Sequence, residues 1–235
     1  MPQSAFKPGN LRRARLHQRG VAALEFALTA PMLLVLLMSM YDIANGWLAW
    51  RRLTAAAQSV GEIATLLAVN ADGSNTLTPD QGWRASTAAY ASMPALLTQN
   101  ARYGVTLSEV LFTKQQGCGG GYCAAYVGWS KGVLGLAAPR PCGTQTAVPD
   151  TSPPGPSVMP QSSFQAAPIL VVDITYGFVP LFLGGVVGPI QMARSAYFPA
   201  RSGNADQSIA YLDPLAQCPV PGAALPNAGG LRSLP

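Results

Sequence analysis

Residues 19–41 read RGVAALEFALTAPMLLVLLMSMY, and this stretch decides how the chain is organised. From Val21 to Tyr41 it contains one charged residue, Glu25. At 1.5 Å per residue, a helix over these positions is about 31 Å long, which matches the hydrocarbon thickness of a bilayer. The run is longer than the apolar part of a secretory signal, and no clean small-residue cleavage site follows it. The stretch therefore predicts one membrane-spanning helix that remains as an anchor.

The residues before this span are basic, and their charge predicts the orientation of the chain. Residues 1–20 contain no acidic side chain and five basic ones: Lys7, Arg12, Arg13, Arg15 and Arg19. The positive-inside rule keeps such a leader in the cytoplasm and places the C-terminal domain outside it. Arg51 and Arg52 follow the span and favour the opposite orientation, but five charges outweigh two. We therefore expect a single-pass membrane protein with its N-terminus in the cytoplasm.

Glu25 is the residue of the span that needs an explanation. A carboxylate within an apolar span costs about 2.5–3.5 kcal/mol near the bilayer centre and less near an end. One interpretation is that Glu25 lies close to the cytoplasmic boundary and is tolerated there. The other depends on its position, because Glu25 is the fifth residue after Gly20, which ends the basic leader.

The string RG-VAALEF-ALTAPMLL resembles the TadE/TadG-like proteins of tight-adherence (Flp) pilus systems, with their type IV-like prepilin cleavage site. The resemblance implies that a prepilin peptidase cuts between Gly20 and Val21 and makes Glu25 the fifth residue of the mature chain. Pro31 and Asp42 match the proline within the family's apolar run and the acid at its outer end. In such assemblies the glutamate is thought to meet the N-terminal amine of a neighbouring subunit.

The same resemblance implies a minor pilin or pseudopilin that takes part in assembling or anchoring the pilus. Its partners would be other pilins or pseudopilins, the inner-membrane assembly platform, the prepilin peptidase and the membrane. The location would be the inner membrane or the pilus itself. The alternative is an unprocessed, membrane-tethered binding or adhesion module, in which Gly20 and Glu25 have no special role.

The anchor helix is expected to continue beyond the membrane. Apolar residues recur at intervals of three and four, which is typical of one buried helix face: Leu53, Ala56, Ala57, Val60, Ile63, Ala64 and Leu67. Asn70 to Gly73 reads as the stop. Thr78, Pro79 and Gln81 then have the pattern of a capping box, and predict a second helix up to about Ser92.

The rest of the chain predicts a small antiparallel sheet and long loops. Strands are expected at Val105–Thr113, at Tyr122–Trp129 and at 168–180, where β-branched and aromatic residues cluster. The block from 171 to 201 again resembles the C-terminal part of TadE/TadG-like domains, with its second strand ending in an arginine. Residues 137–168 are rich in Pro, Ser, Gly and Gln and are expected to be irregular.

Two readings of the late apolar residues remain open. A second membrane helix over 169–193 is disfavoured by Asp173, by Pro180 and Pro189, and by the three glycines between these prolines. Residues 181–190 instead predict an exposed apolar patch that contacts a partner or the membrane surface. The expected fold is therefore α+β and pilin-like: a leader (1–20), a transmembrane and amphipathic helix (21–68), an extracytoplasmic domain (69–203) and an irregular tail (204–235).

All four cysteines follow the membrane span, where an exported domain favours disulfides. They are Cys118, Cys123, Cys142 and Cys218. The short CGGGYC loop could close one bridge, which would leave the last two cysteines to pair. Three pairings are possible, and the sequence alone does not choose among them.

Charge and composition disfavour nucleic-acid binding and catalysis. After the leader, basic and acidic residues are balanced, whereas a nucleic-acid protein needs a basic face on its folded domain. The only histidine, His17, lies in the leader, so the mature chain would lack a Ser-His-Asp triad, a Cys-His pair and the commonest metal ligand. No phosphate-binding glycine loop or nucleophile elbow occurs. The sequence therefore predicts no catalytic residue, cofactor or metal.

Overall fold

The computed structural model describes residues 10–71, 73–93, 103–114, 122–135, 137–153, 155–164, 167–201 and 208–219. They fall into two compact units, one within 1–46 and 180–188 and the other within 47–179 and 189–235. Helix α1 (Asn10–Ala68) contributes to both units. It begins before the expected Val21 and continues past Pro31, then ends as expected just before Asn70.

The second unit is built on a sheet with the strand order β5-β4-β3-β2-β6-β7. Its strands are β2 (Tyr103–Lys114), β3 (Tyr122–Gly135), β4 (Thr144–Val148), β5 (Val158–Pro160), β6 (Ile169–Phe178) and β7 (Ile190–Pro199). All neighbours are antiparallel except β4 and β5, which are parallel. The α+β class is confirmed, and the sheet is mixed because of this parallel pair. The stretch 169–193 contains β6, the short helix α4 (Gly184–Val187) and the start of β7 rather than a second membrane helix.

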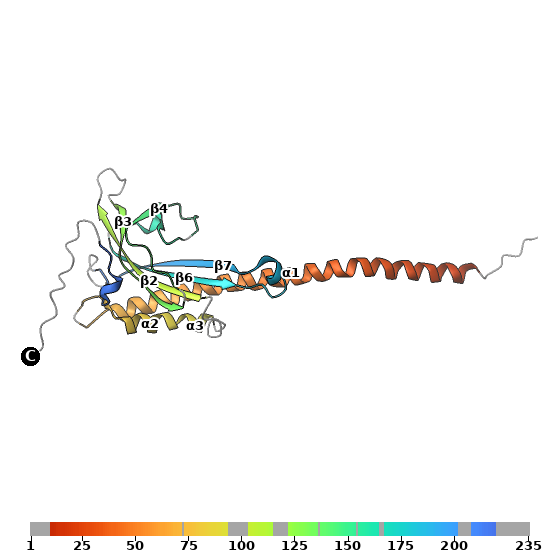
Figure 1. Ribbon diagram of the computed structural model, residues 1–235, viewed down its shortest axis with the longest axis horizontal. Helices are drawn as coiled ribbons and strands as arrows, with labels where there is room; N and C mark the ends of the chain where they lie inside the picture. Colours follow the sequence, from red (N-terminus) through yellow and green to blue (C-terminus); the bar gives the residue numbers. More distant parts are fainter. Residues whose placement is uncertain are drawn as a thin grey trace, which may run out of the picture. The chain divides into compact units, whose positions relative to one another are not determined.

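The outer turns of α1 pack on one face of this sheet, as Figure 1 shows along β6 and β7. The predicted helix stripe is confirmed. Its side chains join Val172 of β6 in the main hydrophobic core, and four of them are fully buried: Leu53, Ala56, Val60 and Ala64. Close packing explains the small residues. At Gly61, a Cβ would collide with the ring of Phe198 on β7, so the helix approaches the strand only because glycine has none.

Two short helices follow α1 and contribute buried side chains to this core. The predicted capping box is confirmed at α2 (Pro79–Thr87), where Thr78 N donates to Gln81 Oε1 (2.8 Å) and Gln81 N donates to Thr78 Oγ1 (3.2 Å). Gln81 Nε2 also donates to the carbonyl of Leu67, near the end of α1 (3.1 Å). Helix α3 (Ala89–Ser92) then ends at Met93, as expected.

Two stretches expected to be irregular contain short elements. The segment 137–168 holds β4, β5 and the 3₁₀ turn η3 (Gln161–Ser163), and β4 continues the sheet beyond β3. Within the expected tail, β8 (Ala210–Tyr211) pairs with β1 (Thr76–Leu77), and η4 (Pro214–Ala216) follows. Strands of two to five residues carry too few side chains for a periodic signal, which explains why composition alone indicated loops.

The segment 137–164 covers the sheet face opposite α1. Side chains alternate along a strand, so Val171 of β6 points away from the face that Val172 gives to the helix. Val171 belongs to a second apolar cluster with Val110, Ala125 and Met159, and all four side chains are 0% exposed. Met159 comes from β5, so the segment supplies part of the core instead of lying over it as a loose loop.

Candidate functional site

The membrane half of α1 is the first candidate site, because its apolar side chains are not buried. Among the described residues, one helix is long and apolar enough to cross a membrane: residues 23–68 of α1, whose most apolar window has a mean hydropathy of 1.9 and no buried residue. Leu24, Leu28 and Leu37, for example, are more than 60% exposed. Such a surface is stable only in lipid or against other apolar helices, and it supports a membrane-anchored protein.

The residues of the expected processing and assembly site lie on this helix. The peptide bond between Gly20 and Val21 lies within α1, and the Val21 side chain is exposed. Glu25 is also exposed, one helical turn further on, and the Thr29 hydroxyl donates to its backbone carbonyl (3.0 Å). No ion pair between described residues involves the Glu25 carboxylate. The roles expected for these three residues stay predictions.

Asp42, at the outer end of the apolar run, has a structural role that its motif did not reveal. Its carboxylate accepts three backbone N–H groups: those of Leu181 (2.9 Å), Phe182 (3.0 Å) and Leu183 (2.8 Å). The residue is 4% exposed. The ring of Tyr41 also meets the ring of Phe182 edge to face, with centroids 5.7 Å apart. Asp42 therefore holds the turn that leads into α4 (Gly184–Val187) against α1.

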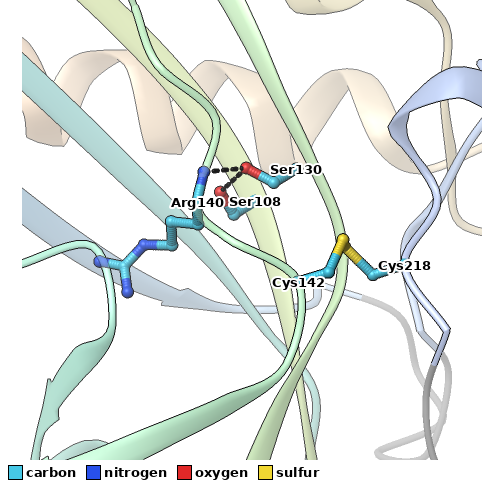
Figure 2. Close-up of a disulfide and its surroundings, with 5 residues drawn as sticks. All are labelled: Ser108, Ser130, Arg140, Cys142 and Cys218. Atoms are coloured by element: carbon cyan, nitrogen blue, oxygen red, sulfur yellow. Dashed lines mark hydrogen bonds between the residues drawn. A yellow bond between two sulfur atoms is a disulfide. The ribbon is translucent and has the colours of Figure 1, made fainter.

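The last two cysteines form a disulfide. Cys142 and Cys218 are bonded and lie 76 residues apart in sequence. Figure 2 shows the bridge beside Ser130, whose hydroxyl accepts from the backbone N of Arg140 (2.6 Å) and is hydrogen-bonded to Ser108 (2.8 Å). The bridge ties the tail to the segment 137–164, close to the point where that segment meets the sheet. Cys118 lies outside the described residues, so its pairing with Cys123 stays a prediction.

Arg140 forms a buried ion pair that sequence reasoning missed. Its side chain is 1% exposed, and it donates to both carboxylate oxygens of Asp173, through Nε (2.5 Å) and Nη2 (2.8 Å). A third bond goes from Nη1 to Gln145 (2.8 Å). Burial disfavours the charged guanidinium, but the hydrogen bonds and charge of Asp173 raise the pKa of Arg140 above its ordinary value. The sequence did contain an indication of this ion pair. Asp173 is the one charged residue in the strand ILVVDITYGF, and a buried carboxylate needs a hydrogen-bonding or charged partner.

Glu109 is a second buried ionisable group, on the helix face of the sheet. It is 3% exposed, and its carboxyl accepts the backbone N–H of Ile209 (2.5 Å). Burial raises the pKa of Glu109 to about 8, although the hydrogen bonds from Ile209 and Trp129 act in the opposite direction. Trp129 in turn donates to the Ile209 carbonyl. These contacts anchor the start of the tail on the sheet.

Among the residues that the structure describes, no metal-binding cluster is found, and the cavity beside the buried ion pair is small. No group of three or more His, Cys, Asp or Glu side chains in this part of the chain could hold a metal ion. The cavity beside Arg140 and Asp173 has a volume of about 230 Å³, below the roughly 300–1,000 Å³ usual for small-molecule sites. The membrane half of α1 and its Asp42 contact are therefore the features that best support a function.

Comparison with known proteins points to the same helix. The model of a family described as TadE-like protein matches residues 20–61. No curated protein and no solved structure matches the chain. The match begins at Gly20 and includes Glu25, Pro31 and Asp42, the positions on which the sequence resemblance was based. Residues 20–61 of this chain therefore carry a TadE-like domain, consistent with a TadE/TadG-like pilus assembly protein.

Proposed function

We propose that the chain is a minor pilin or pseudopilin of a tight-adherence pilus, cut by a prepilin peptidase between Gly20 and Val21. It is held in the inner membrane by α1, with its N-terminus in the cytoplasm and its folded domain outside. Its role is structural rather than catalytic, and its partners are other pilins or pseudopilins and the inner-membrane assembly platform. The observation that carries this proposal is an unburied apolar helix that presents Glu25 within a TadE-like segment.

The chemistry of the first turn explains why cleavage and Glu25 belong together. Cutting after Gly20 removes the five basic side chains of the leader and leaves one α-amino group, which is largely protonated at neutral pH. Within one chain, Val21 and Glu25 are four residues apart and face the same side of the helix. In an assembly, the amine of a neighbouring subunit can replace this local partner. A charge pair in an apolar surrounding then sets the stagger between subunits, as a buried polar residue sets register in a coiled coil.

Because the proposed cleavage site lies inside α1, the helix must unwind locally before the peptidase can cut it. A peptide bond within a helix must be released from its hydrogen-bonded turn before it can enter a protease cleft. Gly20 favours this release because glycine costs about 1 kcal/mol relative to alanine in a helix. It also leaves space for close approach by the enzyme, since it carries no Cβ.

The test is the N-terminus and mass of the chain isolated from its native membrane, with and without the prepilin peptidase. A start at Val21 that depends on the peptidase supports the proposal. An intact leader in the presence of the peptidase would overturn it and favour the unprocessed, membrane-tethered adhesion module.

A second experiment separates assembly from processing. Glu25→Gln keeps the size of the side chain but removes its charge, and we expect normal cleavage with loss of co-assembly with other pilins. Glu62→Gln is the matched control, because Glu62 is an exposed acid on the outer part of the same helix. Equal co-assembly of the Glu25 variant and the control, measured by co-purification from cross-linked membranes, would contradict the charge-pair mechanism.

A further inference from the structure

The turn that precedes and includes α4 is apolar and exposed. We call residues 181–187 (LFLGGVV) the α4 turn. Leu181 is 71% exposed, Phe182 47%, Val186 87% and Val187 57%. No charged residue occurs between Asp173 and Arg194 in the sequence, so the turn has no charged side chain to keep it in water. Monomeric soluble domains rarely present such a continuous apolar group of side chains.

The backbone of the α4 turn is unusually well suited to an apolar surrounding. The N–H groups of residues 181, 182 and 183 all donate to Asp42. Those of Val186 and Val187 donate to the carbonyl of Leu183, and that of Gly188 donates to Gly184. The flanking residues 180 and 189 are prolines, which have no N–H to satisfy. Because an unpaired backbone N–H is costly in lipid, the pairing of these six N–H groups lowers the barrier to insertion of an irregular turn.

Asp42 also sets the depth of the turn relative to the membrane span. It follows directly on Val21–Tyr41, the segment whose length matches the hydrocarbon core. Around it on α1, Met40 is 76% and Ile43 72% exposed, so the apolar helix surface continues past the level of the contact. Both parts belong to one compact unit, and Figure 1 shows the α4 turn, in dark teal, beside α1. The turn is therefore held level with the outer end of the span.

We propose that the α4 turn inserts its apolar side chains into the outer lipid–water interface of the bilayer that α1 crosses. The membrane favours this occupant because the turn is continuous with the lipid-facing helix surface and carries no charge. An added Cβ at Gly185 or Gly188 would meet no atom within 4 Å, so the turn is open to its surroundings at both glycines. The inference rests on α1 crossing a membrane, but not on cleavage after Gly20 or on pilus assembly.

The experiment uses the full chain in vesicles of phosphatidylethanolamine and phosphatidylglycerol, with one spin label per variant. Val186→Cys reports on the α4 turn, and Leu215→Cys is the matched control, an apolar residue that is 91% exposed in the other unit. Val35→Cys, in the middle of the span, reports whether α1 crosses the bilayer. Labelling is done without reductant so that Cys142–Cys218 stays bonded, and the unsubstituted chain measures background labelling.

The measured quantity is the ratio of collision rates with oxygen, which concentrates in lipid, and with a water-soluble nickel chelate. We expect this ratio to be several-fold higher at position 186 than at 215, and highest at 35. Adding Asp42→Ala to the 186-labelled chain should lower its ratio towards that of 215, because the turn loses the acceptor of three N–H groups. An unchanged ratio would overturn the depth-setting role of Asp42.

Failure of this inference is distinguishable from failure of the membrane anchor. A lipid-like ratio at 35 with equal ratios at 186 and 215 would overturn insertion of the α4 turn while leaving the anchor intact. A water-like ratio at 35 would overturn the anchor and the inference together. Dipolar broadening at 186 with low collision rates for both reagents would show that a second copy of the chain covers the turn, and would also overturn insertion.

Discussion

The two faces of the central sheet are covered in different ways. On one face, the outer turns of α1 spread many small apolar contacts along β6 and β7. On the other, the segment 137–164 is held, besides the pairing of β4 with β3, by a few individual groups: the Arg140–Asp173 ion pair, the Met159 side chain and the disulfide of Cys142. The helix face resembles ordinary core packing, in which each contact adds little. The second face depends on individual groups, so single substitutions there should have the larger effects.

The disulfide should give the largest effect. Replacing both Cys142 and Cys218 by serine removes a closure between residues 76 positions apart, and loop entropy predicts a loss of about 4 kcal/mol in unfolding free energy. Urea unfolding of the full chain in detergent micelles measures this. A loss below about 1 kcal/mol would mean that the ion pair and Met159 hold the segment without the bridge.

The ion pair should come next. Arg140→Met leaves the Asp173 carboxylate only 20% exposed and without its cation, and should cost about 3 kcal/mol in the same assay. Arg84→Met is the control, because Arg84 pairs with Asp80 at the surface and should cost at most about 0.5 kcal/mol. The double variant of Arg140→Met and Asp173→Leu should recover much of the loss. Equal effects of the two arginine variants would refute the importance of burial.

The helix face should be less sensitive to single changes, even at its tightest point. Gly61→Leu places a large side chain against the ring of Phe198, and overpacking should cost about 2 kcal/mol. Ala55→Leu on the exposed side of α1 should change stability by less than about 0.5 kcal/mol. Thermal unfolding of the two variants compares them directly. A neutral Gly61→Leu would show that α1 is not closely packed on β7.

Glu109 adds a pH dependence to the helix face. Its folded-state pKa of about 8 lies above the ordinary value of 4.5, so the folded chain keeps the proton that the unfolded chain releases. This contribution to stability is fully present below pH 4.5 and is lost as the pH rises towards 8. Glu109→Gln should therefore gain stability relative to the unsubstituted chain as the pH rises from 5 to 8. Parallel pH curves for Glu109→Gln and the unsubstituted chain would argue against a raised pKa of Glu109.

The sequence by itself determined the parts of the molecule that depend on local patterns. The apolar run from Val21, the helical stripe from Leu53 to Leu67 and the capping box at Thr78 each follow from spacings of a few residues, and the structure confirms the last two as helix positions. The β-branched block at 169–178 was recognisable as a strand for the same reason. Glu25 and Asp42 were singled out by a motif, although only the structure shows which groups Asp42 contacts.

Tertiary structure alone decided the contacts between distant residues. Asp42 meets Leu181 across 139 positions, Arg140 meets Asp173 across 33, and Cys142 meets Cys218 across 76. Single polar or sulfur contacts of this kind produce no periodic pattern in the sequence. Composition was then the only guide to the segment 137–164, and its Pro-rich composition predicted an irregular loop. The physical reason is that helices and strands repeat their burial every few residues, whereas a point contact is specified only once the chain has folded back on itself.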